Sequence, residues 1–284
     1  MTGTRPVLRV EHLHVRRGTT ILKDINWRVE RGQHWGILGA NGSGKTTLLN
    51  ALTGYSPATA GRVEVRGQEF GKYDWRELRK QIGLVSHHIT QMMDRPLTAR
   101  DTVLSGKEAM LNYAVKGSTE DEAKSWRILR QVQCEHLAER SWLTLSQGER
   151  QRVAIGRSIM ADFQLLLLDE PCAGLDPVAR EGFLAFVECL ARGKTSPTLV
   201  LVTHHTDEIM PSFTHVLVLK SGRVLASGEK RQILTSSVLS DAFDTPATLV
   251  TSDSRYVMRI SRNGLIFSSP DRPLENDETG GDGI

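Results

Sequence analysis

The sequence lacks several features that would each have indicated a class of protein. It has no run of about 18 apolar residues, so no segment is expected to span a bilayer, and its opening residues lack the apolar core of a secretory signal peptide. Its three cysteines, Cys134, Cys172 and Cys189, show no C-x-x-C spacing, which favours reduced thiols over a disulfide framework or metal site. A net charge of +3 is too small to indicate nucleic-acid binding. These absences predict a soluble intracellular protein without a nucleic-acid partner.

What the sequence does contain is a complete phosphate-binding loop. An apolar run, Trp35–Leu38, leads into the pattern G-x-x-x-x-G-K-[ST], and a helix-compatible segment follows it. The glycines allow a tight backbone path that points several N–H groups at one anion, and the helix N-terminus adds partial positive charge. In this pattern Lys45 reaches the β- and γ-phosphates, and the Thr46 hydroxyl ligates Mg²⁺. The predicted nucleotide-binding residues are Gly39, Ala40, Asn41, Gly42, Ser43, Gly44, Lys45, Thr46 and Thr47.

Two later apolar runs end in polar side chains. Phe163–Leu168 is followed by Asp169 and Glu170, and Leu199–Thr203 is followed by His204. Short apolar runs are typical of strands buried on both faces of a parallel sheet, and α/β proteins bind ligands at the carboxyl edge of such a sheet. We therefore expect Asp169 to hold Mg²⁺ beside the loop and Glu170 to act as the general base. His204 is expected to hydrogen-bond the γ-phosphate.

Two further motifs flank the strand that ends in the two carboxylates. Leu145–Gln151 (LSQGERQ) precedes this strand, and Ala173–Asp176 (AGLD) follows it. In order and spacing, these motifs and the phosphate-binding loop resemble the ATP-binding cassette (ABC) ATPases over roughly residues 7 to 230. The resemblance implies an α/β fold: a P-loop NTPase ABC cassette with a mixed-sheet core, an antiparallel β subdomain and a helical subdomain that presents the signature.

The same resemblance assigns residues to a dimer of cassettes. It identifies Ser146, Gln147, Gly148 and Glu149 as the signature, which contacts ATP held by the P-loop of a partner cassette. Gln147 and Glu149 stand where the family most often has Gly and Gln, whereas Ser146 and Gly148 match it. Asp176 corresponds to the D-loop residue that contacts the partner.

Two further positions depart from the family pattern. His87 stands where a glutamine commonly ligates Mg²⁺, and histidine titrates near neutral pH. Gln91 is an alternative for this role, and His87 and His88 could instead be a pair of surface histidines. The aromatic residue that usually stacks on adenine corresponds to Arg17, whose guanidinium plane either stacks on the base or is solvated at a turn.

The chain is predicted to contain one cassette followed by a C-terminal extension. Residues 1–245 form the predicted cassette, with the helical subdomain at about 95–140. Alternating apolar residues within 246–268 predict a small hairpin appendage. Residues 269–284 are rich in acids and glycine and poor in apolar side chains, so they predict a disordered tail.

The β-rich part of the cassette shows two local patterns. Ser221-Gly222 lies between two short apolar segments and predicts a hairpin turn. A period-2 alternation near the N-terminus predicts an antiparallel strand with one buried face. The residues expected on that face are Ile21, Ile25, Trp27 and Val29.

These features together predict the ATP-binding and ATP-hydrolysing subunit of an ABC transporter. Its expected cofactor is Mg²⁺ and its expected partners are ATP, a second cassette (a homodimer or a paired cassette) and separate transmembrane permease subunits. Its expected location is cytoplasmic, peripheral on the inner face of the cell membrane. The alternative is a soluble single-cassette ABC ATPase with a regulatory role, whereas the signature disfavours a P-loop kinase or small GTPase.

Overall fold

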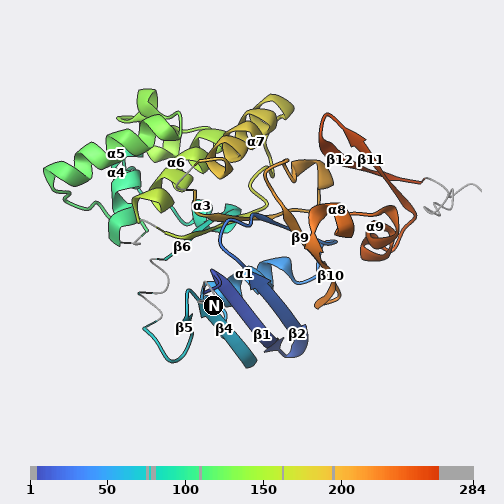
Figure 1. The fold of residues 1–284 in the computed structure, drawn as a ribbon. Coiled ribbons are helices and arrows are strands. Elements are labelled where there is room, and N and C mark those ends of the chain that lie inside the picture. The colour runs from blue at the N-terminus through green and yellow to red at the C-terminus, as the bar shows by residue number, and fades with distance from the viewer. Residues whose placement is uncertain are drawn as a thin grey trace, which may run out of the picture.

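The computed structural model of the chain describes residues 5–74, 77, 81–108, 111–161, 163–193 and 196–261, and for His87 and His88 the backbone alone. Within these residues the elements form layers (Figure 1), with a small antiparallel sheet on one side of a larger sheet and helices on the other. The predicted acidic tail, 269–284, and the last part of the predicted appendage, 262–268, lie outside the described residues.

The larger sheet is mixed and forms the centre of the described fold. Its strands have the order β10-β9-β3-β8-β7-β6; all neighbouring pairs are parallel except β10 with β9. Their bounds are β3 (Trp35–Leu38), β6 (Ile82–Ser86), β7 (Leu165–Asp169), β8 (Thr198–Val202), β9 (His215–Lys220) and β10 (Arg223–Glu229). Every residue of β8 is buried, as expected for a parallel strand covered on both faces.

The smaller sheet is antiparallel, and register shifts mark an extra residue in each of its two long strands. Its strands have the order β2-β1-β4-β5. Their bounds are β1 (Leu8–Arg17), β2 (Thr19–Val29), β4 (Ala60–Val65) and β5 (Gln68–Glu69). The predicted alternation was wrong at the start of β2, because Leu22 is buried where Ile21 was expected to be. The β1–β2 register shifts there and Asp24 has φ 55°, so an extra residue exchanges the two faces of the strand.

Helices cover the face of the larger sheet that is opposite the small sheet, and one helix follows the phosphate-binding loop. Trp142, Leu168 and Phe183 belong to the core under these helices, whereas Trp27, Trp35 and Leu49 belong to a second core between the two sheets. The helices are α1 (Lys45–Leu52), α3 (His87–Gln91), α4 (Ala99–Leu104), α5 (Thr119–Gln131), α6 (Gln147–Met160), α7 (Pro177–Ala191), α8 (Lys230–Ile233) and α9 (Ser236–Phe243). Short 3-10 turns are η1 (Ser105–Glu108), η2 (Glu135–Leu137), η3 (Trp142–Thr144) and η4 (Thr206–Glu208).

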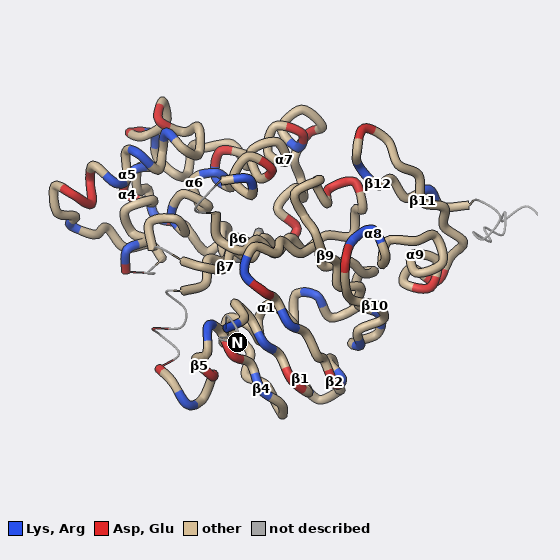
Figure 2. The backbone as a smooth tube through the Cα atoms, viewed as in Figure 1, with Lys and Arg blue, Asp and Glu red and all other residues tan. Residues whose placement is uncertain are grey.

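Two hairpins complete the described fold. β9 and β10 are joined at Ser221-Gly222, where both residues have positive φ, as a tight two-residue hairpin turn requires. A C-terminal hairpin, β11 (Ala247–Ser252) and β12 (Arg255–Ile260), follows α9. In the view of Figure 2, Lys and Arg are interspersed with Asp and Glu over all layers. None of the described helices combines the length and the apolar content needed to cross a bilayer.

Candidate functional site

The phosphate-binding loop joins β3 to α1 along a path that requires glycine at two positions. Gly39 has φ 156°, and a Cβ added there would lie 2.4 Å from the carbonyl oxygen of Leu219. Gly44 has φ 104°, and its added Cβ would lie 2.7 Å from a leucine side chain of β2. The turn of the β9–β10 hairpin supports the loop, because the Gly222 N–H donates to the Ser43 carbonyl at 3.0 Å. A hydrogen bond from outside the motif therefore stabilises the conformation of the loop.

Lys45 begins α1 and places a buried ammonium inside this loop. Its Nζ donates to the carbonyl oxygens of Gly39 at 2.9 Å and Ala40 at 3.1 Å. The side chain is 5% exposed, and Nζ lies 3.9 Å from Oε1 of Glu170. Burial lowers the pKa of Lys45, while the charges of Glu170 and Asp169 oppose that shift. A cation is thus fixed where the loop is expected to bind phosphate.

The carboxyl ends of β6 and β7 meet the start of α1 at one cavity. Ser86 pairs in register with Asp169, so two polar side chains end neighbouring strands at the same edge. The cavity has a volume of about 420 Å³ and is lined by Thr46, Ser86, Gln147, Asp169, Glu170, Ala173 and Gly174. Ser86 and the Gln147 contact with this cavity were missed by sequence reasoning. For Ser86 the signal was present, since it is the polar last residue of a short apolar strand.

Among the residues that line this cavity, Asp169 has the pKa that is shifted most clearly from its ordinary value. Burial and then the charge of Glu170 raise the pKa of Asp169 to about 6, while Lys45 and a hydrogen bond from Thr46 act in the opposite direction. Among the described residues, the buried Oδ1 of Asp169 has no hydrogen-bond partner. A buried, unpartnered carboxylate oxygen is costly unless a cation binds it. With the Thr46 hydroxyl beside it, this oxygen fits the hard-oxygen preference of Mg²⁺.

Glu170 and His204 face each other across the ends of β7 and β8. The Oε1 of Glu170 lies 3.3 Å from Nδ1 of His204, and the two side chains are 35% and 37% exposed. Glu170 has φ 46°, a left-handed conformation that is uncommon for residues other than glycine. Its N–H donates to the Val202 carbonyl at 2.9 Å, which ties this turn to β8. Backbone strain of this kind concentrates at functional sites, and no sequence pattern indicated it here.

The signature motif forms the beginning of α6 and caps it. The Ser146 hydroxyl accepts from the Glu149 N–H at 3.4 Å, and the Glu149 carboxylate accepts from the Ser146 N–H at 2.7 Å. Burial acts to raise the pKa of Glu149, but the hydrogen bonds with Ser146 and the charges of Arg140 and Arg152 together lower it. This capping box follows from the sequence pattern S-x-x-E. Glu149 therefore has a structural role that a Gln at this position could also fill, which is compatible with the exchange; sequence reasoning missed this role.

Gln147 and Asp176 connect the signature to the segment after β7. The side-chain amide of Gln147 donates to the carbonyl of Ala173. Asp176 caps α7, because its Oδ1 accepts from the N–H groups of Val178 and Ala179, each at 2.9 Å. Gly148 lies 3.7 Å, measured from an added Cβ, from the side chain of Leu175. The signature and the D-loop therefore lie side by side within one chain.

Arg17 is the last residue of one strand, and His87 directly follows the last residue of another. Arg17 ends β1, and its guanidinium donates to the hydroxyl of Ser56 at 2.8 Å. His87 begins α3 directly after Ser86, and its side chain lies outside the described part of the structure. The expected adenine contact of Arg17 and Mg²⁺ contact of His87 both stay predictions, as does the alternative that Gln91 takes the latter role.

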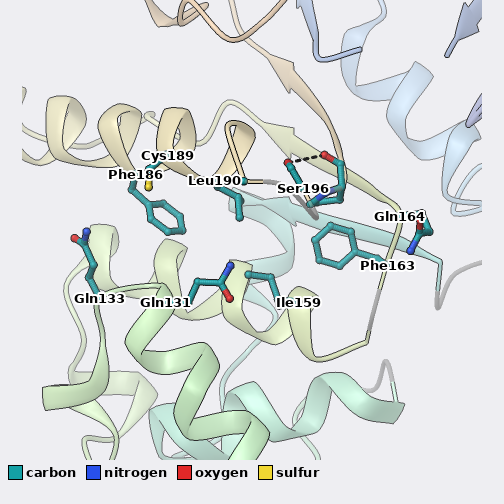
Figure 3. Close-up of a pocket in the computed structure, with 11 residues that line it drawn as sticks. Gln131, Gln133, Ile159, Phe163, Gln164, Phe186, Cys189, Leu190 and Ser196 are labelled. Carbon is teal, nitrogen blue, oxygen red and sulfur yellow. Dashed lines mark hydrogen bonds between the residues drawn. The ribbon is translucent and has the colours of Figure 1, made fainter. Parts of the chain in front are cut away.

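A second hollow lies at the opposite edge of the larger sheet (Figure 3). It has a volume of about 350 Å³, and residues that line it, Phe163 and Pro197, precede β7 and β8. Phe186 and Cys189 reach it from α7, and none of the described residues that line it is charged. The hollow is therefore separate from the cavity at Thr46 and Asp169, which lies at the carboxyl ends of these strands.

The comparisons with known proteins identify the family. The family model for the ABC transporter matches residues 22–173 of this chain. The uncharacterized ABC transporter ATP-binding protein YlmA of Bacillus subtilis (strain 168) is 41% identical over 251 residues, which are 88% of this chain and 95% of YlmA. This chain belongs to the ABC transporter ATP-binding proteins. The uncharacterized ABC transporter ATP-binding protein YmeB of Lactococcus lactis subsp. lactis (strain IL1403) is 35% identical over 253 residues, covering 88% of this chain and 97% of YmeB.

A solved structure supports the same fold and function. The structure of cbiO1 from Clostridium perfringens, part of the ABC transporter complex cbiONQ, superposes with a TM-score of 0.71 at 27% identity. The superposition covers 84% of this chain and 94% of cbiO1. The expected family, the cassette fold and the ATP-binding and ATP-hydrolysing function of a transporter subunit are confirmed. The regulatory alternative receives no support from these relatives.

Proposed function

We propose that this ABC transporter subunit binds Mg²⁺ and ATP in the cavity between the phosphate-binding loop and the ends of β6 and β7. One atom carries the proposal: Oε1 of Glu170 lies 3.3 Å from His204 and 3.9 Å from the Lys45 ammonium. Three motifs that are far apart in the sequence therefore converge on a single carboxylate oxygen. That convergence supports an arrangement for chemistry on a phosphate bound at Lys45.

In this proposal each residue has one task. The loop N–H groups and Lys45 hold the β- and γ-phosphates, while Thr46 and Asp169 hold Mg²⁺. When bound, the metal ion neutralises negative charge on the phosphate oxygens. Glu170 accepts a proton from the attacking water, and His204 holds the Glu170 carboxylate and the γ-phosphate in position.

The location of the signature supports the proposal that a second cassette binds to this one. Ser146 and Gly148 line a separate hollow of about 350 Å³ beside Asp176, and neither lines the cavity at the loop of its own chain. A serine hydroxyl and backbone N–H groups at a helix start form a second anion site. We infer that this site closes over ATP bound to a second cassette, in a homodimer or a pair of related chains. Closure would drive transport through separate transmembrane subunits at the inner face of the cell membrane.

The decisive experiment is Glu170→Gln in the full-length chain. ATP binding should be retained, while hydrolysis should slow by roughly 10²–10⁴, the usual effect of losing a positioned base. ATP should then accumulate a dimer in size-exclusion chromatography. Lys45→Ala is the negative control for binding, and Glu64→Gln is the matched glutamate substitution away from the cavity. Unchanged turnover in Glu170→Gln would remove Glu170 from the mechanism.

A further inference from the structure

The C-terminal hairpin is docked on the turn that follows β8 (Figure 1). The N–H of Met258 in β12 donates at 3.0 Å to the hydroxyl of Thr206, a buried residue that begins η4. Leu249, Tyr256 and Met258 pack half-buried against the main core. The ring of Tyr256 also lies 5.8 Å from the buried ammonium of Lys230. The hairpin is therefore attached to the cassette by polar and apolar contacts.

Ion pairs attach the same hairpin to α7. Arg255 of β12 binds Glu181 in a two-point contact, with distances of 3.0 Å and 2.7 Å. The same carboxylate accepts from Arg180 at 3.2 Å. Arg180 in turn binds Asp207 at 2.6 Å and Glu208 at 3.2 Å. A continuous chain of charges thus joins β12, α7 and η4.

The chain of contacts ends on both neighbours of His204. Glu208 is 3% exposed, and its second carboxylate oxygen accepts from the Thr203 hydroxyl at 2.5 Å. The Thr203 hydroxyl accepts from the N–H of His205 at 3.0 Å. Thr203 and His205, the residues before and after His204, are therefore held by the carboxylate that Arg180 binds.

We propose that the C-terminal hairpin is a positioning element for ATP hydrolysis, in which Arg255 and Thr206 act through His204. The proposal rests on the function proposed above for His204. Through Thr206 the hairpin fixes η4, and through Glu181 it fixes the helix whose Arg180 holds η4 from the other side. A displacement of about 1 Å at a catalytic group can reduce a rate by as much as roughly a hundredfold.

The first test separates positioning from nucleotide binding. In the purified full-length chain, Arg255→Ala should lower kcat for ATP roughly tenfold and leave KM within about twofold, because the phosphate-binding loop is untouched. Arg259→Ala is the matched control, since Arg259 lies exposed on the same strand and forms no ion pair within the described residues. The conservative variant Arg255→Lys, which keeps a cation beside Glu181 and leaves the contact of Glu181 with Arg180 in place, should retain more of kcat than Arg255→Ala.

A second pair of variants removes the other attachment. Thr206→Val deletes the hydroxyl that Met258 binds and should also lower kcat, whereas Thr206→Ser keeps the hydroxyl and should retain kcat. Loss of melting temperature in Arg255→Ala and Thr206→Val with unchanged kcat would make the hairpin a stabilising element alone, and the proposal would be wrong.

The last test asks whether the effect passes through His204. In a His204→Ala background, Arg255→Ala should cause no further loss of kcat, because the residue it positions is absent. An equal loss in both backgrounds would overturn the proposal. The NMR signals of the His204 ring, in ¹³C-histidine-labelled protein, should shift in Arg255→Ala and not in Arg259→Ala. If His204→Ala alone leaves kcat unchanged, the proposed role of His204 fails, while the ring signals still report whether the hairpin positions it.

Discussion

Asp169 should make the nucleotide-free protein less stable at high pH, and Asp169→Asn should remove this dependence. Burial raises the pKa of Asp169 from 3.8 to about 6. Between these two values the folded protein keeps a proton on Asp169 that the unfolded chain has released. The free energy of unfolding therefore falls as pH rises through this window, and the contribution is fully lost above about pH 6.

The size of the effect follows from the shift. At about 1.4 kcal/mol per pKa unit, a shift of about two units corresponds to about 3 kcal/mol at pH 8, as an order of magnitude. About half of this develops between pH 5 and pH 8. Asparagine does not titrate, but its buried amide costs about 1–3 kcal/mol at every pH if it stays unpartnered. The pH dependence is therefore the quantity to compare, because the amide cost cancels from it.

The assay is urea unfolding of the nucleotide-free chain in chelator at pH 5, 6.5 and 8. The stability of the wild type should fall relative to Asp169→Asn by about 1.5 kcal/mol between the lowest and highest pH. Asp241→Asn, an exposed aspartate, is the matched control and should follow the wild type. Parallel curves for wild type and Asp169→Asn would refute the burial argument.

Three further predictions concern the loop, the signature and the departure at His87. Gly39→Ala should abolish ATP binding measured by calorimetry, because its added Cβ would lie 2.4 Å from a backbone carbonyl. Gly42→Ala adds only the backbone strain of φ 79° and has nothing within 4 Å of its Cβ, so it should bind ATP more weakly than the wild type but measurably. Ser146→Arg should bind ATP as a monomer yet form no dimer and hydrolyse nothing, and normal hydrolysis by a monomer would contradict the paired-cassette proposal. His87→Gln should flatten the acid limb of the ATPase pH profile if neutral His87 replaces the glutamine, and His88→Gln should not; identical acid limbs in wild type and His87→Gln would make His87 a surface histidine.

The sequence predicted those features that depend on local pattern. The loop from Gly39 to Thr46 and the strand ending at Asp169 each combine an apolar run with polar residues at its end, and the parallel sheet brings such ends together. The capping box of Ser146 with Glu149 had a readable signal as well, although only its family role was recognised. The left-handed backbone of Glu170 had none, because it arises where the chain turns between β7 and α7.

Features that depend on long-range geometry could not be predicted from the pattern. The bulge at Asp24 reverses which residues of β2 face the core, since one inserted residue exchanges the faces of a period-2 strand. The docking of β12 rests on pairs such as Arg255 with Glu181, which are 74 residues apart in the sequence. The sequence around a surface arginine does not indicate which acidic residue will pair with it.

The position of α7 allows these long-range contacts to transmit a displacement from one end of the helix to the surroundings of His204. Asp176 caps the N-terminus of α7, and Arg180, one turn later, holds the η4 turn next to His204. A helix moves as a unit over such a short distance, so a displacement of its capped end shifts the Arg180 contacts too. If a partner cassette contacts Asp176, as the family resemblance implies, binding of that cassette should therefore change the surroundings of His204. In ¹³C-histidine-labelled Glu170→Gln, ATP should change the His204 ring signals when it binds the monomer, through the γ-phosphate, and should change them again at protein concentrations where the dimer forms. The absence of this second change would exclude the link.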